Sequence, residues 1–206
     1  MQEKNLNDLF LDTVKDIYFA EKQILKSLPK MAKAANSDKL RAAFEKHHAE
    51  TEVQVERLEQ IFELLGKSAR GKTCDAIMGI LEEGKEIMEE YKGTDALDAG
   101  LLAAAQAVEH YEISRYGTLK SWATKLGLTD AAKLLDLTLA EEKNTDIALT
   151  RLAGSAVNAE AAQNSAFEIG CRNSPPLHLA PHSLDNNGGP DAGRRSISSF
   201  ACASDG

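Results

Sequence analysis

Four long stretches of the chain repeat apolar residues at intervals of three and four, and this period allows only one kind of regular structure. Such steps return to the same face of an α-helix, whereas a strand alternates with a period of two. The pattern predicts long helices over residues 9–33, 39–65, 94–126 and 130–162, with a shorter helix over 75–91. At 1.5 Å per residue, each long helix spans about 40 Å or more. No stretch alternates for long enough to predict a strand, so the chain is expected to be all-α.

Polar and glycine residues mark the ends of these helices. Asn5 or Asn7 can cap the first helix, and Pro29 is expected to bend or locally break it. Gly66 and Gly127 follow the second and the third long helix, where glycine commonly ends a helix. These signals divide the sequence into separate helices rather than one continuous helix.

Four long helices and one short helix specify a helical bundle. The short helix lies between the second and third long helices, so we place it in the connection through which the chain crosses over. The bundle is expected to occupy residues 1–164. From about residue 165 to 206, proline, asparagine and glycine clusters break every periodicity, which predicts an irregular or disordered tail. An extension that is not native to the fold explains this tail as well as a biological one does.

Glu21 stands on the apolar face of the first helix. Val14, Ile17, Glu21, Ile24 and Leu28 share a sector roughly 80° wide at about 100° per residue. Glu21 is therefore expected to point inward. A lone ionised carboxylate in a protein interior loses several kcal/mol of hydration, so it must be neutralised, paired or bound to a cation.

The other long helices also place acidic residues or histidine on their inward faces. The candidates are His47 and Glu50 on the second, Glu109 and Glu112 on the third, and Glu142 and Asp146 on the fourth. Carboxylates at the middle of four bundle helices are the arrangement that holds dinuclear iron or manganese centres, with imidazole completing the coordination. The sequence therefore predicts a metal site for two such ions.

A second interpretation of these residues needs no metal. The chain has 32 acidic residues, and an acidic residue on a helix is usually solvated. Arg57 and Arg115 could also pair with the inward carboxylates and form a buried ionic network without catalysis. Tyr18 and Tyr116 lie one helical turn from Glu21 and Glu112, either as hydrogen-bond donors near a metal or as ordinary core residues.

The composition restricts the partners. A formal net charge of −8 and an isoelectric point near 5.2 argue against a nucleic-acid backbone. No apolar run approaches the roughly 18 residues needed to span a membrane. The polar N-terminus lacks the pattern of an export signal, so a cytoplasmic protein is expected. The three cysteines show neither metal-ligand spacing nor a disulfide framework.

Four motifs resemble one known family. YFAEKQ at 18–23, HHAET at 47–51, EHYEISRYG at 109–117 and EEK at 141–143 are similar to the YciE/YciF-type bacterial stress-protein family, a branch of the ferritin-like superfamily. The likeness covers about residues 5 to 163. It implies a ferritin-like bundle, commonly dimeric, from bacteria under general or oxidative stress, with a dinuclear iron or manganese site and no settled reaction. The carboxylates that match this site are Glu21, Glu50, Glu112 and Glu142.

The chain departs from the usual pattern of that superfamily at two positions. A histidine commonly follows a helical ligand glutamate by three residues, but Val53 follows Glu50 and Thr145 follows Glu142 at this spacing. With fewer imidazoles, the site would bind metal more weakly or lack redox function.

Two functions therefore stay open. The first is a cytoplasmic, homodimeric stress protein that binds two iron or manganese ions, with possible metal oxidation by oxygen or peroxide. The second is a non-catalytic helical interaction protein with a buried salt-bridge network.

Overall fold

The computed structural model describes residues 3–159 and 161–162, which all belong to one compact unit. These residues form α1 (Leu6–Ala34), α2 (Asp38–Leu64), α3 (Asp75–Glu90), α4 (Leu97–Lys125), α5 (Thr129–Leu152) and a π-helical turn, η1 (Ala153–Val157). Within this part of the chain there is no strand, which confirms the all-α prediction. The predicted tail, residues 165–206, lies outside the described residues.

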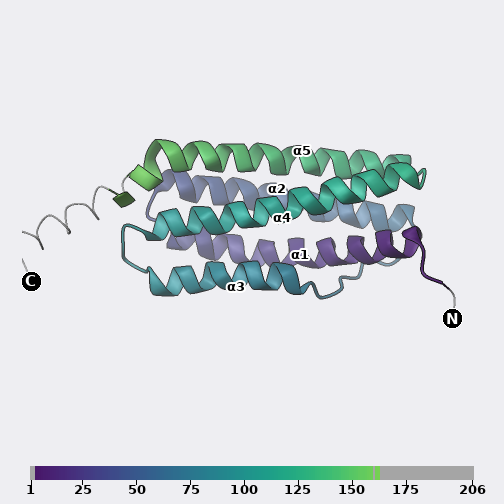
Figure 1. Ribbon diagram of the computed structural model, residues 1–206, viewed down its shortest axis with the longest axis horizontal. Helices are drawn as coiled ribbons and strands as arrows, with labels where there is room; N and C mark the ends of the chain where they lie inside the picture. The colour runs from purple at the N-terminus through teal and green to yellow at the C-terminus, as the bar shows by residue number, and fades with distance from the viewer. Residues whose placement is uncertain (1–2, 160, 163–206) are drawn as a thin grey trace, which may run out of the picture. The chain divides into compact units, whose positions relative to one another are not determined.

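The four long helices lie side by side (Figure 1), and their contacts form a closed ring. α1 contacts α2, α2 contacts α5, α5 contacts α4, and α4 returns to α1. α3 lies outside this ring, against α1 and α4. The short turns between α1 and α2 and between α4 and α5 make each of these pairs antiparallel.

The connection from α2 to α3 runs along the outside of α1. The Lys72 amide donates a hydrogen bond to the Lys15 carbonyl over 3.1 Å. A Cβ atom at Gly71 would lie 3.0 Å from Cβ of Phe19, so only glycine fits this approach without displacing a neighbour. This connection and α3 carry the chain from α2 to α4.

Two helices end in the same hydrogen-bonded motif. Gly66 and Gly127 have φ angles of 61° and 72°, a region that disfavours other residues. Each glycine amide bonds back to a carbonyl three residues earlier, and the next amide bonds to one five residues earlier. The predicted ends at both glycines are confirmed.

The first helix begins as expected but is not broken where expected. Asn5 accepts hydrogen bonds from the Asn7 and Asp8 amides, and Asp8 bonds back to the Asn5 amide in a capping box. α1 continues through Pro29, so of the expected bend or break the break does not occur. Buried side chains on both sides of the proline, Leu28 and Met31, hold the helix against the core despite the lost backbone hydrogen bond.

Apolar side chains from all five helices fill the space between them. Among the largest fully buried ones are Phe10, Phe44, Phe62, Ile77 and Leu101. No helix in the described part of the chain is both long and apolar enough to cross a membrane.

A buried aspartate on α4 holds the turn between α1 and α2. The Asn36 amide donates to Asp98 Oδ1 over 2.8 Å, and the Ser37 amide donates to Oδ2 over 2.7 Å. Asp98 is 8% exposed, so these bonds are largely shielded from water. This carboxylate fixes the start of α2, the helix that carries His47.

We expect Asp98→Ala to lower the free energy of unfolding by about 2 kcal/mol, because two backbone donors lose a charged acceptor. The matched control is Asp95→Ala, a change at an exposed aspartate in the preceding turn that should cost less than about 0.5 kcal/mol. Urea unfolding measures both, and equal values for the two variants would contradict this role of Asp98.

Candidate metal centre

Four buried residues from three helices converge at the centre of the ring. They are His47 on α2, Glu109 and Glu112 on α4, and Glu142 on α5. Each can place one ligand atom within 4.8 Å of the others. His47 is 2% exposed and the three glutamates are 0% exposed, so the cluster is out of contact with water.

Helical spacing accounts for this convergence. Glu109 and Glu112 are three residues apart, which places both on the same side of α4. Glu142 follows Leu135 and Leu139 on the buried side of α5, and His47 follows Leu40 and Phe44 on α2. The apolar neighbours that bury each helix therefore also bury its ionisable residue.

The His47 ring contacts carboxylates with both of its nitrogens. Nδ1 lies 3.1 Å from Glu109 Oε1, and Nε2 lies 3.9 Å from Oε2 of both Glu112 and Glu142. The imidazole is thus surrounded by groups that are themselves metal ligands when deprotonated.

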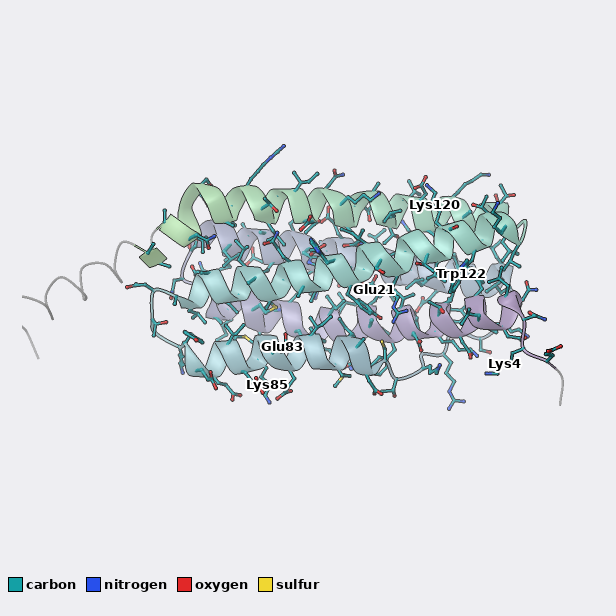
Figure 2. The ribbon with its side chains drawn as sticks, viewed as in Figure 1. Lys4, Glu21, Glu83, Lys85, Lys120 and Trp122 are labelled. Atoms are coloured by element: carbon teal, nitrogen blue, oxygen red, sulfur yellow. The ribbon has the colours of Figure 1, made fainter. Side chains whose placement is uncertain are left out.

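Glu21 adds a fourth buried carboxylate from α1. It lies midway along the helices, between α1 and α4, and is 0% exposed (Figure 2). The Tyr116 hydroxyl donates a hydrogen bond to Glu21 Oε1, while Oε2 has no partner. The tyrosine therefore orients Glu21 and leaves one oxygen available.

Most polar atoms of this cluster lack a hydrogen-bond partner. Both carboxylate oxygens of Glu109, Glu112 and Glu142, and Nε2 of His47, are buried and have no N–H or hydroxyl partner. The carboxyls can pair only with one another through a shared proton, Glu21 with Glu112 and Glu109 with Glu142. Buried polar groups in folded proteins are nearly always satisfied, and each unsatisfied one costs about 1–3 kcal/mol or more when charged. The donor set consists of carboxylate oxygens and one imidazole, which are ligands for divalent metal ions.

Burial strongly shifts the ionisation of these groups. Desolvation raises the pKa of Glu21 to about 7 and that of Glu109 to about 8. It also raises the pKa of Glu112 and of Glu142 well above the ordinary value, and the neighbouring carboxylates add to both shifts. Desolvation lowers the pKa of His47 to about 4, so the ring is neutral near pH 7. Without cations the cluster therefore favours the protonated carboxyls and a neutral imidazole.

Two of the sequence-predicted ligands lie at the edge of the cluster. Glu50 pairs with Lys46 through Oε1, while its Oε2 is buried without a partner. Asp146 Oδ1 accepts a hydrogen bond from Gln106 over 3.2 Å and lies 3.2 Å from His110 Nε2. Both side chains are about one quarter exposed, at 28% and 23%. The structure thus gathers Glu21, His47, Glu109, Glu112 and Glu142 centrally and places these two acidic residues outside them.

The two arginines named as alternative partners do not reach the central carboxylates. Arg57 forms a bidentate pair with Glu141, at 2.5 and 2.7 Å, and Arg115 lies over the Tyr111 ring. Over residues 3–159 and 161–162, no lysine or arginine forms an ion pair with Glu21 or with the three glutamates of the cluster. The salt-bridge interpretation therefore lacks its cations at this site. Glu141 was not among the candidates named from the sequence, because it lies 84 positions from Arg57 on another helix and no local pattern connects the two.

The fold and the cluster together define an all-helical protein with a buried site of glutamates and one histidine. The family model described as domain of unknown function DUF892 matches residues 5–162. Protein YciF of Escherichia coli K12 is 45% identical over 167 residues, which cover 81% of this chain and all of the relative. The chain therefore belongs to the YciF-type DUF892 family, as its motifs predicted.

Solved structures give the same result. The E. coli stress protein YciF matches with a TM-score of 0.72 and 45% identity, covering 76% of this chain and 99% of YciF. YcfI from Rhodopseudomonas palustris, for which a structural role has been suggested, matches with a TM-score of 0.70 and 44% identity over 72% of this chain and 95% of its own. A protein from Xanthomonas campestris, 22% identical with a TM-score of 0.61 over 78% of this chain and 98% of its own, shares the fold.

The raised carboxyl pKa values predict that the metal-free protein loses stability as pH rises from 6.5 to 8. In the unfolded chain glutamates ionise near pH 4.3, whereas folded Glu109 keeps its proton to about pH 8. The folded state thus binds more protons, so raising the pH favours unfolding, by on the order of 1–2 kcal/mol over this window. The lowered pKa of His47 acts only below about pH 6.5. Urea unfolding in chelator at both pH values measures the loss.

Glu109→Gln tests the assignment of this pH dependence. The variant keeps the shape of the side chain but cannot ionise, so it should be more stable than the wild type at pH 8. Its free energy of unfolding should also fall less between pH 6.5 and 8. Glu83→Gln, at an exposed position on α3, should keep the wild-type slope. If the free energy of unfolding fell equally with pH in all three proteins, Glu109 would not be the source of the pH dependence.

Proposed function

We propose that the chain is a ferritin-like stress protein that binds a dinuclear iron or manganese centre between its four long helices. In this proposal α1, α2, α4 and α5 are the four-helix bundle, and α3 is the additional helix in its crossover. The observation that carries the proposal is the set of buried carboxylate oxygens that have no hydrogen-bond partner around His47. A dry cluster of this kind is stable in its ionised form only with cations.

The residues present fit two cations better than one. His47, Glu109, Glu112 and Glu142 can supply one ligand atom each around a single point. Glu21 lies close enough to Glu112 to share a proton with it, and loss of that proton would leave buried oxygens for a second cation between these two carboxylates. Glu50 has a second oxygen, Oε2, that is buried and not bonded to Lys46, and Asp146 is held by Gln106 and His110.

The protein contributes charge, orientation and dryness to this site. Four buried carboxylates balance the charge of two divalent cations without other counter-ions. Tyr116 holds Glu21 in place through its hydrogen bond. Glu141 binds the Arg57 guanidinium outside the cluster, so this positive charge does not pair with the central carboxylates. When bound, a pair of iron or manganese ions would supply two one-electron oxidations, matching the two-electron reduction of hydrogen peroxide to water.

The family supports the physiological part of the proposal. E. coli YciF is described as a stress protein, and the motifs of this chain match its family over most of the sequence. We extend the stress role, a cytoplasmic location and a homodimeric state to this chain as predictions. A purely structural role, as suggested for the R. palustris relative, would leave the unpaired carboxylates without an explanation.

Metal binding should stabilise the folded protein. Manganese at about one hundred times its dissociation constant should add about 2.7 kcal/mol per occupied site to the free energy of unfolding, and chelator should remove this gain. Elemental analysis should find about two ions per chain in protein purified without chelator. The Glu21→Gln/Glu112→Gln variant should lose both the stabilisation by manganese and the bound ions, which would place the ions at these carboxylates.

The control is Glu83→Gln/Glu86→Gln, which removes the same two charges from the exposed face of α3. It should bind metal like the wild type. Full metal content in the Glu21→Gln/Glu112→Gln protein would place the ions elsewhere, and unchanged stability with metal would favour a non-catalytic interaction protein.

Redox function has its own test. Anaerobic loading with ferrous ion and then addition of peroxide should produce a ferric absorbance band at one peroxide per two ions. A protein with normal metal content that gives no such band would support the metal site and contradict the proposed metal oxidation.

A further inference from the structure

A cavity lies away from the carboxylate cluster, lined by residues of α1, α3 and α4. α3 packs against the other two helices there (Figure 1). The volume of the cavity is about 220 Å³. Methionines from two helices line it, namely Met31 on α1 with Met78 and Met88 on α3, and Val108 on α4 forms part of its wall. Methionine adapts its shape to apolar ligands, and Met78 is 43% exposed at the edge of the cavity.

The polar part of this cavity is positively charged. Lys26 and Lys30, one helical turn apart on α1, line it together with Lys85 on α3. Lys85 is neutralised by Glu82, whose Oε1 it reaches over 2.7 Å. Among the described residues, Lys26 and Lys30 have no ion-pair partner.

We propose that this cavity binds a fatty-acid-like ligand, an aliphatic chain that ends in a carboxylate. The chain would lie among Met31, Met78 and Met88, and the carboxylate would pair with Lys26 and Lys30. The volume is below the roughly 300–1,000 Å³ typical of pockets for drug-sized molecules, so a slender chain of moderate length fits better than a ring system. The proposal is independent of metal binding, because none of the central carboxylates lines this cavity.

Binding of decanoate to the full-length protein, measured by calorimetry below its micelle concentration, tests the proposal. Two probes with the same tail separate the contributions of tail and charge. Decanoate should bind one to one. Decanol should bind about tenfold more weakly because it lacks the charge, and decyltrimethylammonium should not bind detectably.

Matched variants locate the binding. Lys26→Gln/Lys30→Gln should weaken decanoate about tenfold and leave decanol unchanged, whereas Lys39→Gln/Lys92→Gln, at exposed lysines outside the cavity, should change neither. Gly84 lines the cavity, and a Cβ there meets only Ala104 at 3.5 Å, so Gly84→Leu should fill the space and block both probes. Gly79→Leu, on the same helix with open space around it, is the control.

Met78→Glu provides a test that does not depend on repacking, because this side chain is already half exposed. Its added negative charge should weaken the binding of decanoate more than the binding of decanol. Equal binding of all three probes, or decanoate binding that survives both Lys26→Gln/Lys30→Gln and Met78→Glu, would overturn the proposal.

Discussion

The structure depends on the burial of five ionisable groups that no lysine or arginine of the described residues pairs with. Glu21, His47, Glu109, Glu112 and Glu142 come from four helices and lie where water does not reach. Their oxygens repel one another and mostly lack hydrogen-bond donors. An arrangement so costly for folding alone is expected where the groups serve a bound ligand.

The remaining contacts keep this cluster in place. The motifs at Gly66 and Gly127 end α2 and α4 within a single turn, and Asp98 anchors the turn that begins α2. Tyr116 orients Glu21 across the α1–α4 interface. The helices are therefore positioned by satisfied hydrogen bonds at their ends, while the unsatisfied groups are confined to the centre. α1 serves two environments, with Glu21 on its inner face and Lys26 on its outer face against the cavity beside α3.

Helical periodicity in the sequence was sufficient to predict the five helices and the inward direction of Glu21, because apolar spacing determines which face is buried. It could not rank the ligand candidates. Glu50 and His47 lie three residues apart on α2, and both fit an inward face, yet His47 is buried while Glu50 pairs with Lys46. That difference depends on the rotation of α2 by a fraction of a turn, which is determined by packing against both α1 and α5. The bond from Asp98 to the turn before α2 joins residues about sixty positions apart, and local patterns do not contain such information.

The most direct test of the metal centre is diffraction from crystals grown with manganese, with data collected at the manganese absorption edge. We predict two anomalous peaks within coordination distance of the carboxylates of Glu21, Glu109, Glu112 and Glu142. Peaks found only at surface carboxylates, with the central glutamates still unliganded, would contradict the account.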